Sequence, residues 1–186
     1  MSTLKTNTIQ AATGSTVNIA SGHTVKTDAI ENLSGVSLIL PDEHFRYGLS
    51  GNQSLATATW AIAQFNTALF NLSNSNFNTS SYRYVVPANK AGVYRFETQQ
   101  NWITAGDFDN CMIGLYKNSG GVAAGGTQIG FSNVRQEAYE TSIAIGVVRL
   151  DVGDYVDVHI RQESGGTISF RQAESTCWFQ GSRIGL

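Results

Sequence analysis

The residues of this chain that could do chemistry are few, and their spacing does not match the local motifs of hydrolases. The three histidines, His23, His44 and His159, lie far apart in the sequence. A serine hydrolase needs a histidine beside its nucleophile, and the Gly-x-Ser-x-Gly turn is absent from the chain. His159 alternates with apolar residues and precedes Arg161, so we expect it to face solvent or an interface. We therefore predict a protein that is not an enzyme.

Two loop segments contain residue types that bind ions. Asp107, Asp109 and Asn110 supply the hard oxygen ligands that calcium uses, but the twelve-residue EF-hand pattern is absent, and a plain polar turn is the alternative. The glycine-rich segment 120–127 lacks the Gly-Lys-Ser/Thr sequence of a phosphate-binding loop. We predict no metal and no cofactor, with calcium at the acidic loop left open.

Cys111 and Cys177 are the two cysteines, and both lie in apolar, strand-like stretches without CxxC spacing. Such cysteines are most often buried free thiols, and a structural disulfide between them is the alternative. The sequence does not decide between the two.

Charge and hydropathy exclude several classes of partner. The net charge is −2 and charged residues make up 14% of the chain, so there is no basic patch that would indicate nucleic-acid binding. No apolar run reaches the 18 residues that a membrane-spanning helix needs. The first ten residues also lack the apolar core of a signal peptide. We expect neither nucleic-acid binding nor membrane insertion.

The chain divides by composition into an arm, residues 1–44, and a head, residues 45–186. The arm contains no Phe, Tyr or Trp and has too little apolar surface to offset the entropy of ordering its backbone. We expect it to be an extended anchor that is ordered only by docking, and that also supports trimerisation. The residues predicted to anchor it are Leu4, Ile9, Val17, Ile19 and Val25.

The head shows repeated alternation of apolar and polar residues, the pattern of strands with one buried face. Turn residues such as Asn118-Ser119-Gly120 and Gly153-Asp154 separate the strands. The clearest rows are Tyr94, Phe96 and Trp102; Cys111, Ile113 and Leu115; Ile143, Ile145 and Val147; and Val156, Val158 and Ile160. Many short strands separated by such turns predict an all-β, two-sheet antiparallel jelly-roll sandwich.

One segment of the head is ambiguous. Ile62, Phe65, Leu69 and Leu72 have the spacing of one face of a helix over residues 60–72. Asn66 and Thr67 in its middle, and the β-rich sequence around it, favour strands instead. We expect strands and keep the amphipathic helix as the alternative.

The order of several motifs in the head resembles the complement globular-head and tumour-necrosis-factor-like jelly rolls. The resemblance spans about 125 residues and implies the jelly-roll fold and assembly into trimers. The motifs that carry it are Ala63–Asn66, Leu69–Asn71, Tyr82–Pro87, Gly92–Phe96, Ile113–Asn118, Val148–Val156 and Phe179–Ile184. The collagen repeat that precedes some such heads is absent from the arm.

The start of the arm, Met1–Gln10 followed by Gly-Ser-Thr-Val, resembles the amino termini of bacteriophage tail-fibre and related virion proteins. This resemblance implies a structural protein on the virion surface, assembled in the host cytoplasm and attached to other virion proteins through its arm. We expect a homotrimeric tail fibre or short appendage. A capsid decoration or head-fibre protein, and a secreted complement-like adhesin or ligand, are the alternatives.

Recognition residues lie preferentially on loops that a rigid scaffold carries. We therefore predict that the head binds a host cell-surface protein or glycan through its exposed loops. Phe108 and Tyr139 can stack on a sugar ring or enter a protein pocket, unless they are tucked beneath their own loops. The candidate binding residues are Asp107, Phe108, Asp109, Asn118, Gln128, Asn133, Tyr139 and Glu140.

Overall fold

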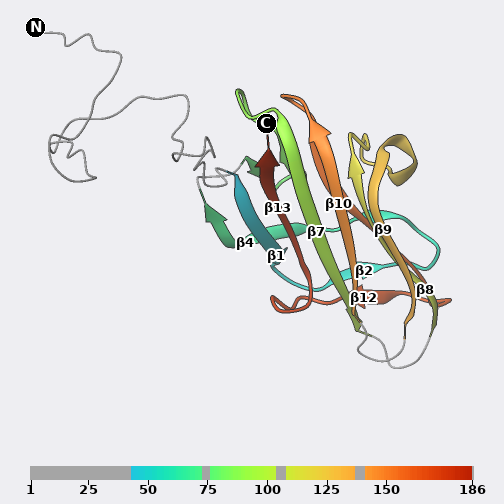
Figure 1. Ribbon diagram of the computed structural model, residues 1–186. Helices are drawn as coiled ribbons and strands as arrows, with labels where there is room; N and C mark the ends of the chain where they lie inside the picture. The colour runs from blue at the N-terminus through green and yellow to red at the C-terminus, as the bar shows by residue number, and fades with distance from the viewer. Residues whose placement is uncertain (1–42, 73–75, 104–107, 137–140, 186) are drawn as a thin grey trace, which may run out of the picture. The chain divides into compact units, whose positions relative to one another are not determined.

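A computed structural model describes residues 43–72, 76–103, 108–136 and 141–185 of the chain. Within these residues the protein is almost entirely β-structure, with one short 3-10 helix, η1, at Ala123–Gly125 (Figure 1). The predicted anchor residues Leu4, Ile9, Val17, Ile19 and Val25 lie outside the described residues. None of the described segments is a helix with the length and apolar character needed to cross a membrane.

Two sheets make up the head. In the first, the strands run in the order β2-β12-β7-β13-β1-β4, and β10 also pairs with β7. Their bounds are β1 His44–Leu49, β2 Gln53–Leu55, β4 Phe65–Leu72, β7 Gly92–Ile103, β10 Thr141–Leu150, β12 Ile168–Phe170 and β13 Trp178–Gly185.

In the second sheet the order is β5-β6-β11-β8-β9, and β3 also pairs with β11. The bounds are β3 Ala61–Ile62, β5 Phe77–Asn78, β6 Arg83–Val85, β8 Phe108–Lys117, β9 Thr127–Gln136 and β11 Tyr155–Glu163. All the pairings between described strands are antiparallel. The predicted antiparallel jelly-roll sandwich is confirmed.

Residues 60–72 form the strands β3 and β4, so the helical alternative is wrong. Phe65 is fully buried, whereas Ile62 and Leu69 are only partly covered. Asn66, which is a poor residue for a helix interior, accepts a hydrogen bond from the Ser50 backbone amide at 2.9 Å. Pairing of β4 with β1 therefore outweighs the weak helical spacing.

Aromatic side chains fill the space between the sheets. The Phe45 ring stacks on Tyr84 at 5.1 Å between ring centroids and meets Phe179 edge-on at 5.4 Å. Each of these rings buries a large apolar area, and offset or edge-on pairs add stability beyond that burial. The fully buried aromatic residues are Phe45, Phe65, Tyr84, Tyr94, Phe96, Trp102, Phe170 and Phe179.

Glu43, the first residue that the structure describes, belongs to the arm by composition but is held inside the sandwich. Glu43 is 4% exposed, and its carboxylate accepts a hydrogen bond from the Tyr84 hydroxyl at 3.2 Å. Burial is the main cause that raises the pKa of Tyr84, so its phenol stays protonated and remains a donor. The Glu43 carbonyl also accepts a hydrogen bond from the Arg183 amide on β13.

Candidate functional site

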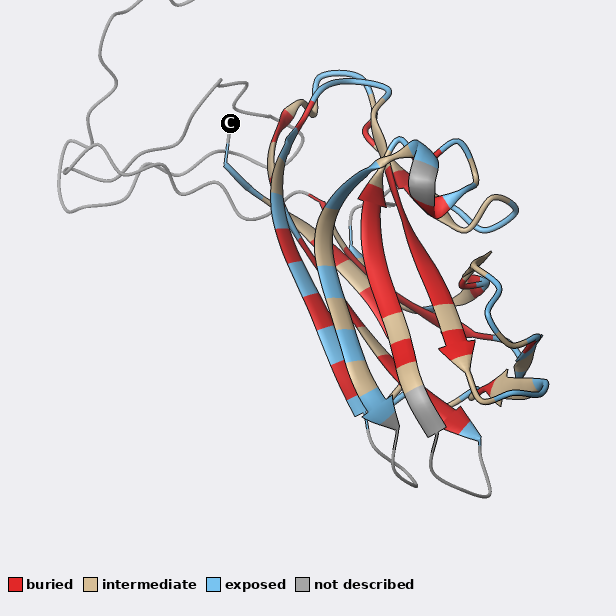
Figure 2. Cartoon of the chain, turned by 90° about the vertical axis from the view of Figure 1, so that its right-hand side faces the viewer, coloured by how far each residue is buried: buried red, intermediate tan, exposed pale blue. Residues whose placement is uncertain are grey.

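The predicted binding loops lie at two opposite ends of the sandwich. Lys117 pairs with Thr127, whereas Phe108 pairs with Gln136 at the other end of the same two strands. The strand connections lie at the two ends of the sandwich (Figure 2). By register, Asn118 and Gln128 lie at one of these ends, together with the turn before Tyr155, which we call the Asn118 end. Asn133 lies toward the opposite end, where Glu163 pairs with Asp109.

Consecutive antiparallel strands place their connections alternately at the two ends of a sheet, so the candidate residues are divided between the two ends. Asp107, Tyr139 and Glu140 lie outside the described residues. Phe108 and Asp109 are at the start of β8, and the structure describes their backbone but not their side chains.

Asn133 belongs to a chain of polar contacts near its end of the sheet. Its amide donates to the Asn110 carbonyl oxygen at 3.1 Å, and the Asn110 amide donates to Glu163 Oε2 at 2.6 Å. Glu163 also pairs with Arg161 at 2.7 Å. In the described part of the chain no three His, Cys, Asp or Glu residues gather as metal ligands, and the calcium hypothesis involves side chains outside it.

At the Asn118 end, Asn118 holds a turn together. Its amide donates to Asp154 Oδ1 at 2.7 Å, and its carbonyl oxygen accepts from the Tyr155 backbone amide at 2.9 Å. Lys117 Nζ lies 2.6 Å from Asp154 Oδ2. Two of the motifs that carry the family resemblance thus contact each other, and the Asn118 side chain is committed to the turn.

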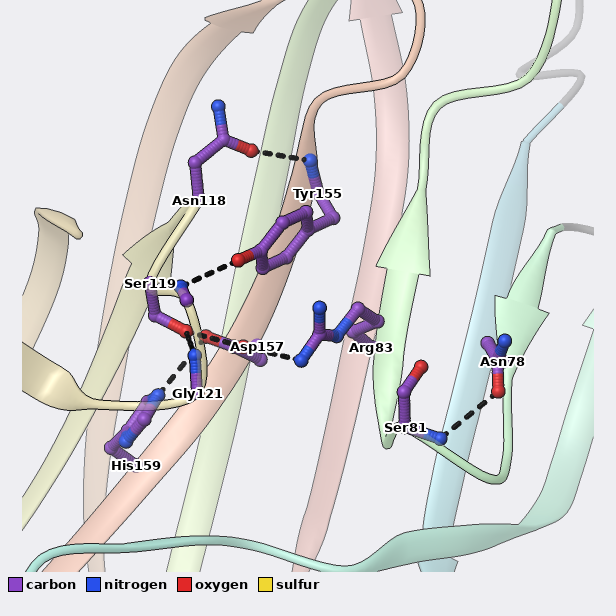
Figure 3. Close-up of polar contacts among 10 residues, drawn as sticks. Asn78, Ser81, Arg83, Asn118, Ser119, Gly121, Tyr155, Asp157 and His159 are labelled. Atoms are coloured by element: carbon purple, nitrogen blue, oxygen red, sulfur yellow. Dashed lines mark hydrogen bonds and ion pairs between the residues drawn. The ribbon is translucent and has the colours of Figure 1, made fainter. Parts of the chain in front are cut away.

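A buried polar cluster lies beneath the loop that follows Asn118 (Figure 3). The Ser119 hydroxyl donates to Asp157 Oδ2 at 2.7 Å, and His159 Nε2 lies 3.2 Å from Asp157 Oδ1. Ser119, Asp157 and His159 are at most 1% exposed. Arg83 lies 3.7 Å from Asp157 and stacks over the Tyr155 ring at 4.1 Å.

The expectation that His159 faces solvent or an interface is therefore wrong, because its side chain is buried within the chain itself. Its strand, β11, is central in the second sheet and pairs with β3, β6 and β8. The ring of Tyr116 also meets the His159 ring edge-on at 5.1 Å. The alternation of apolar and polar residues correctly predicts that β11 is a strand. It does not predict the burial of His159, because other segments cover the outer face of β11 as well.

The cluster is not arranged as a hydrolase triad. The Ser119 hydroxyl and the His159 ring both bond to Asp157, so no contact between serine and histidine activates a nucleophile. Burial of the serine also leaves no access for a substrate. The Gly121 amide donates to Ser119 Oγ at 3.0 Å, and the Gly120 amide donates to the Tyr155 hydroxyl at 2.6 Å. These contacts hold the glycine-rich loop on the sheet.

The outer face of the first sheet is a larger surface, which we call the seven-stranded face. Across it, in register, runs the row Ile145, Glu97, Gln180, Arg46 and Phe70. Next to it runs the row Val147, Arg95, Ser182, His44 and Leu72. Each row begins on β10 with an aliphatic side chain and ends on β4 with an apolar one.

The centre of the seven-stranded face is polar and satisfied internally. Arg46 donates to Gln180 Oε1 through Nε at 2.8 Å, and Gln180 donates to Glu97 at 3.0 Å. Glu97 also pairs with Arg95 at 2.7 Å. The Arg46 guanidinium lies over the Trp178 ring, 4.4 Å from its centroid. In this ladder Glu97 neutralises Arg95, whereas the Arg46 guanidinium is held by the neutral Gln180 amide oxygen and by the Trp178 ring.

The aliphatic flank of this face is exposed. Ile143, Ile145 and Val147 on β10 are 49%, 51% and 59% exposed, and Leu72 on the opposite flank is 56% exposed. The predicted alternation of β10 is confirmed, but its small residues face the core. A Cβ on Gly146 would lie 2.6 Å from the Ile129 carbonyl oxygen, so the close approach of β9 leaves room only for small side chains there.

Cys111 and Cys177 are both buried free thiols. Burial raises the pKa of both thiols, in the case of Cys177 to about 12. Thiolates are the reactive form, so neither cysteine has the properties of a nucleophile.

No protein-family model and no curated protein sequence matches the chain. Solved structures do match its fold. Murine APRIL at pH 5.0 has a TM-score of 0.58 and 11% sequence identity, covering 76% of this chain and 98% of that one. Eiger TNF from S. frugiperda has a TM-score of 0.51 and 12% identity, with 76% and 90% covered.

The globular domain of zebrafish complement 1qA has a TM-score of 0.50 and 17% identity, with 76% and 96% of the two chains covered. The head therefore has a jelly-roll fold like those of the tumour necrosis factors and the complement globular heads. At these identities the likeness concerns the fold and not the activity.

Proposed function

We propose that this protein is a homotrimeric, non-enzymatic virion protein, a tail fibre or short appendage, on the virion surface. In this proposal the arm, residues 1–44, attaches the chain to other virion proteins, and the jelly-roll head binds the host surface. The resemblance of Met1–Gln10 to tail-fibre amino termini supports the virion assignment. The fold supports a binding role, because it presents loops on a rigid sandwich.

The observation that carries the proposal is the seven-stranded face. Its two apolar flanks differ: β10 presents aliphatic side chains, and β4 presents Phe70 and Leu72. Two unlike flanks on one subunit fit a heterologous contact, in which the β10 flank of one copy packs on the β4 flank of the next. Such a contact closes into a ring when the rotation between copies is 120°. Three binding sites on one body then raise avidity without new contacts.

The mass of the full chain in solution tests the assembly. We expect sedimentation equilibrium at micromolar concentration to give three times the chain mass of 20.1 kDa. Ile145→Arg should give monomers, because it places a charge in the centre of the aliphatic flank. Val152→Arg is the matched control, since Val152 is 55% exposed in the turn between β10 and β11 and is not part of either row. A monomeric wild type, or an unchanged mass for Ile145→Arg, would contradict the assembly.

Adsorption of particles to host cells tests the attachment role. Purified full chain should block adsorption, and the Ile145→Arg variant should block it far less well because it loses avidity. If a saturating concentration of the trimer leaves adsorption unchanged, the head is not the attachment protein.

A further inference from the structure

A second surface lies on the outer face of the second sheet, on the side of the sandwich away from the seven-stranded face. There the Trp60 ring lies 6.5 Å from the Phe131 ring and 6.4 Å from the Tyr116 ring, between centroids. We call these three residues the aromatic platform. Phe131 is 41% exposed, and Trp60 is partly exposed. The Phe131 ring, in the middle of β9, is therefore exposed to solvent and is not part of the hydrophobic core.

The platform is shaped by a glycine at its centre. Gly114 on β8 pairs directly with Phe131 on β9. A Cβ on Gly114 would lie 2.5 Å from a ring carbon of Tyr116, so the Tyr116 ring leans over this glycine. The Phe131 ring therefore has no side chain opposite it on β8.

Two uncharged amides lie beside Phe131 along β9. Gln128 accepts a hydrogen bond from the Tyr116 hydroxyl at 3.2 Å through Oε1, so its amide nitrogen is left as a donor. Asn133 uses its amide nitrogen to donate to Asn110, so its carbonyl oxygen is left as an acceptor. Within the described residues, the exposed ring thus lies between a donor and an acceptor.

The platform carries no charge and rests on a rigid base. Of the ionic side chains on the neighbouring strand β11, Asp157 is buried against Ser119 and Arg83, and Arg161 and Glu163 pair with each other at 2.7 Å. Beneath the platform, the His159 ring supports Tyr116 edge-on, and Asp157 and Ser119 hold that histidine in a fully buried network. A site whose rings are already held in place loses little conformational entropy on binding.

We propose that the aromatic platform binds a neutral pyranose sugar, such as a hexose or an N-acetylhexosamine of a surface glycan. The C–H face of the sugar stacks on Phe131 and Trp60, and its hydroxyl groups accept from Gln128 and donate to Asn133. The absence of charge on the platform favours a neutral sugar over a sialylated or phosphorylated one. Contact between copies through the seven-stranded face leaves this surface free, so an assembled protein presents several sites. The proposal rests on the attachment role proposed above and deepens it, because it names a partner class and a site that joins the predicted residues Gln128 and Asn133 to the rings of Phe131 and Trp60.

Binding of neutral sugars to the full chain tests the proposal directly. Tryptophan fluorescence is a suitable signal, because Trp102 and Trp178 are 1% and 7% exposed and Trp60 is the more accessible ring. We expect titration with neutral methyl glycosides to change this emission, and a glycan array to show neutral glycans bound more tightly than sialylated ones.

Variants locate the site. Phe131→Ala should weaken sugar binding by about tenfold or more, as loss of a stacked ring requires. Gln128→Leu should weaken it less, because it removes one donor and keeps the ring. Val152→Ala, the truncation of an exposed apolar side chain elsewhere, should leave binding unchanged. Phe131→Ala should keep the mass and melting temperature of the wild type, since Phe131 is not part of the core.

Three results would overturn the inference: no neutral sugar bound at millimolar concentration, preference for sialylated glycans, or full binding by Phe131→Ala. Capture of a host protein without any glycan would overturn it as well. These outcomes are separate from failure of the proposed function, which is read from the chain mass and from particle adsorption. If a monomeric chain bound the sugar, the sugar-binding inference would be supported and the proposed trimer would be contradicted.

Discussion

At the scale of single residues, Asp154 shows how a sequence motif becomes a contact. Burial alone would raise the pKa of its carboxyl group, but the hydrogen bonds from Lys117, Asn118 and the Asp151 backbone outweigh burial and lower that pKa below its ordinary value. The folded state therefore favours the ionised carboxylate. The stability that this gives is present above the ordinary pKa of an aspartate, about 3.9, and is lost as the pH falls through the lowered pKa.

We expect Asp154→Ala to lower the free energy of unfolding at pH 7 by about 1–3 kcal/mol, because Lys117 and Asn118 lose their acceptor. Chemical denaturation between pH 7 and pH 3 measures the effect. The wild type should lose stability on acidification, and Asp154→Asn should lose less of it. Asp151→Asn, at an exposed carboxylate in the same turn, is the control and should behave like the wild type.

At the scale of secondary-structure elements, the close contact between β13 and the aromatic core depends on Gly181. It pairs with Phe45 on β1 and with Phe96 on β7. A Cβ at this position would lie 2.6 Å from a Phe96 ring carbon and 2.8 Å from a Phe45 ring carbon. Both rings are buried in the core and have little room to move.

Gly181→Ala should therefore destabilise the head by about 1–3 kcal/mol, the usual cost of overpacking a core. Gly166→Ala is the matched control, because a Cβ there would meet nothing within 4 Å. Thermal unfolding of the two variants side by side measures the difference. Equal melting temperatures would mean that the sheets can separate enough to accept the methyl group.

At the scale of the whole molecule, the head has its own core and the arm has none in its sequence. The buried aromatic residues all lie between Phe45 and Phe179. Glu43, which the Tyr84 hydroxyl and the Arg183 amide hold in place, is the earliest residue that the structure describes. A chain that begins at Pro41 keeps all of these contacts.

Deletion of residues 1–40 should therefore leave a head with the circular dichroism spectrum and melting temperature of the full chain. In the proposed function this truncated chain no longer enters particles, which immunoblotting of purified particles measures. Unfolding of the truncated chain would show that the arm is part of the folded core. A folded head that still enters particles would place the anchor elsewhere.

The sequence by itself determined the class of fold. Period-2 alternation along Tyr94–Trp102 and Cys111–Leu115, with turn residues at Asn118 and Gly153, specifies strands and their ends through local physics. The order of these motifs also gave the jelly-roll resemblance before any coordinates. Lys117 and Asn118 belong to one of these motifs and Asp154 to another, and the contacts between them join the two motifs in the folded head.

Only the tertiary structure decided which strand faces are covered. Alternation is the same whichever face is buried, so the sequence of β10 does not show that Ile143, Ile145 and Val147 are exposed while Ala144 is in the core. For the same reason it does not show that His159 is buried beneath Tyr116. Contacts such as Trp60 with Phe131 and Ser119 with Asp157 join residues far apart in the chain, and folding alone brings them together.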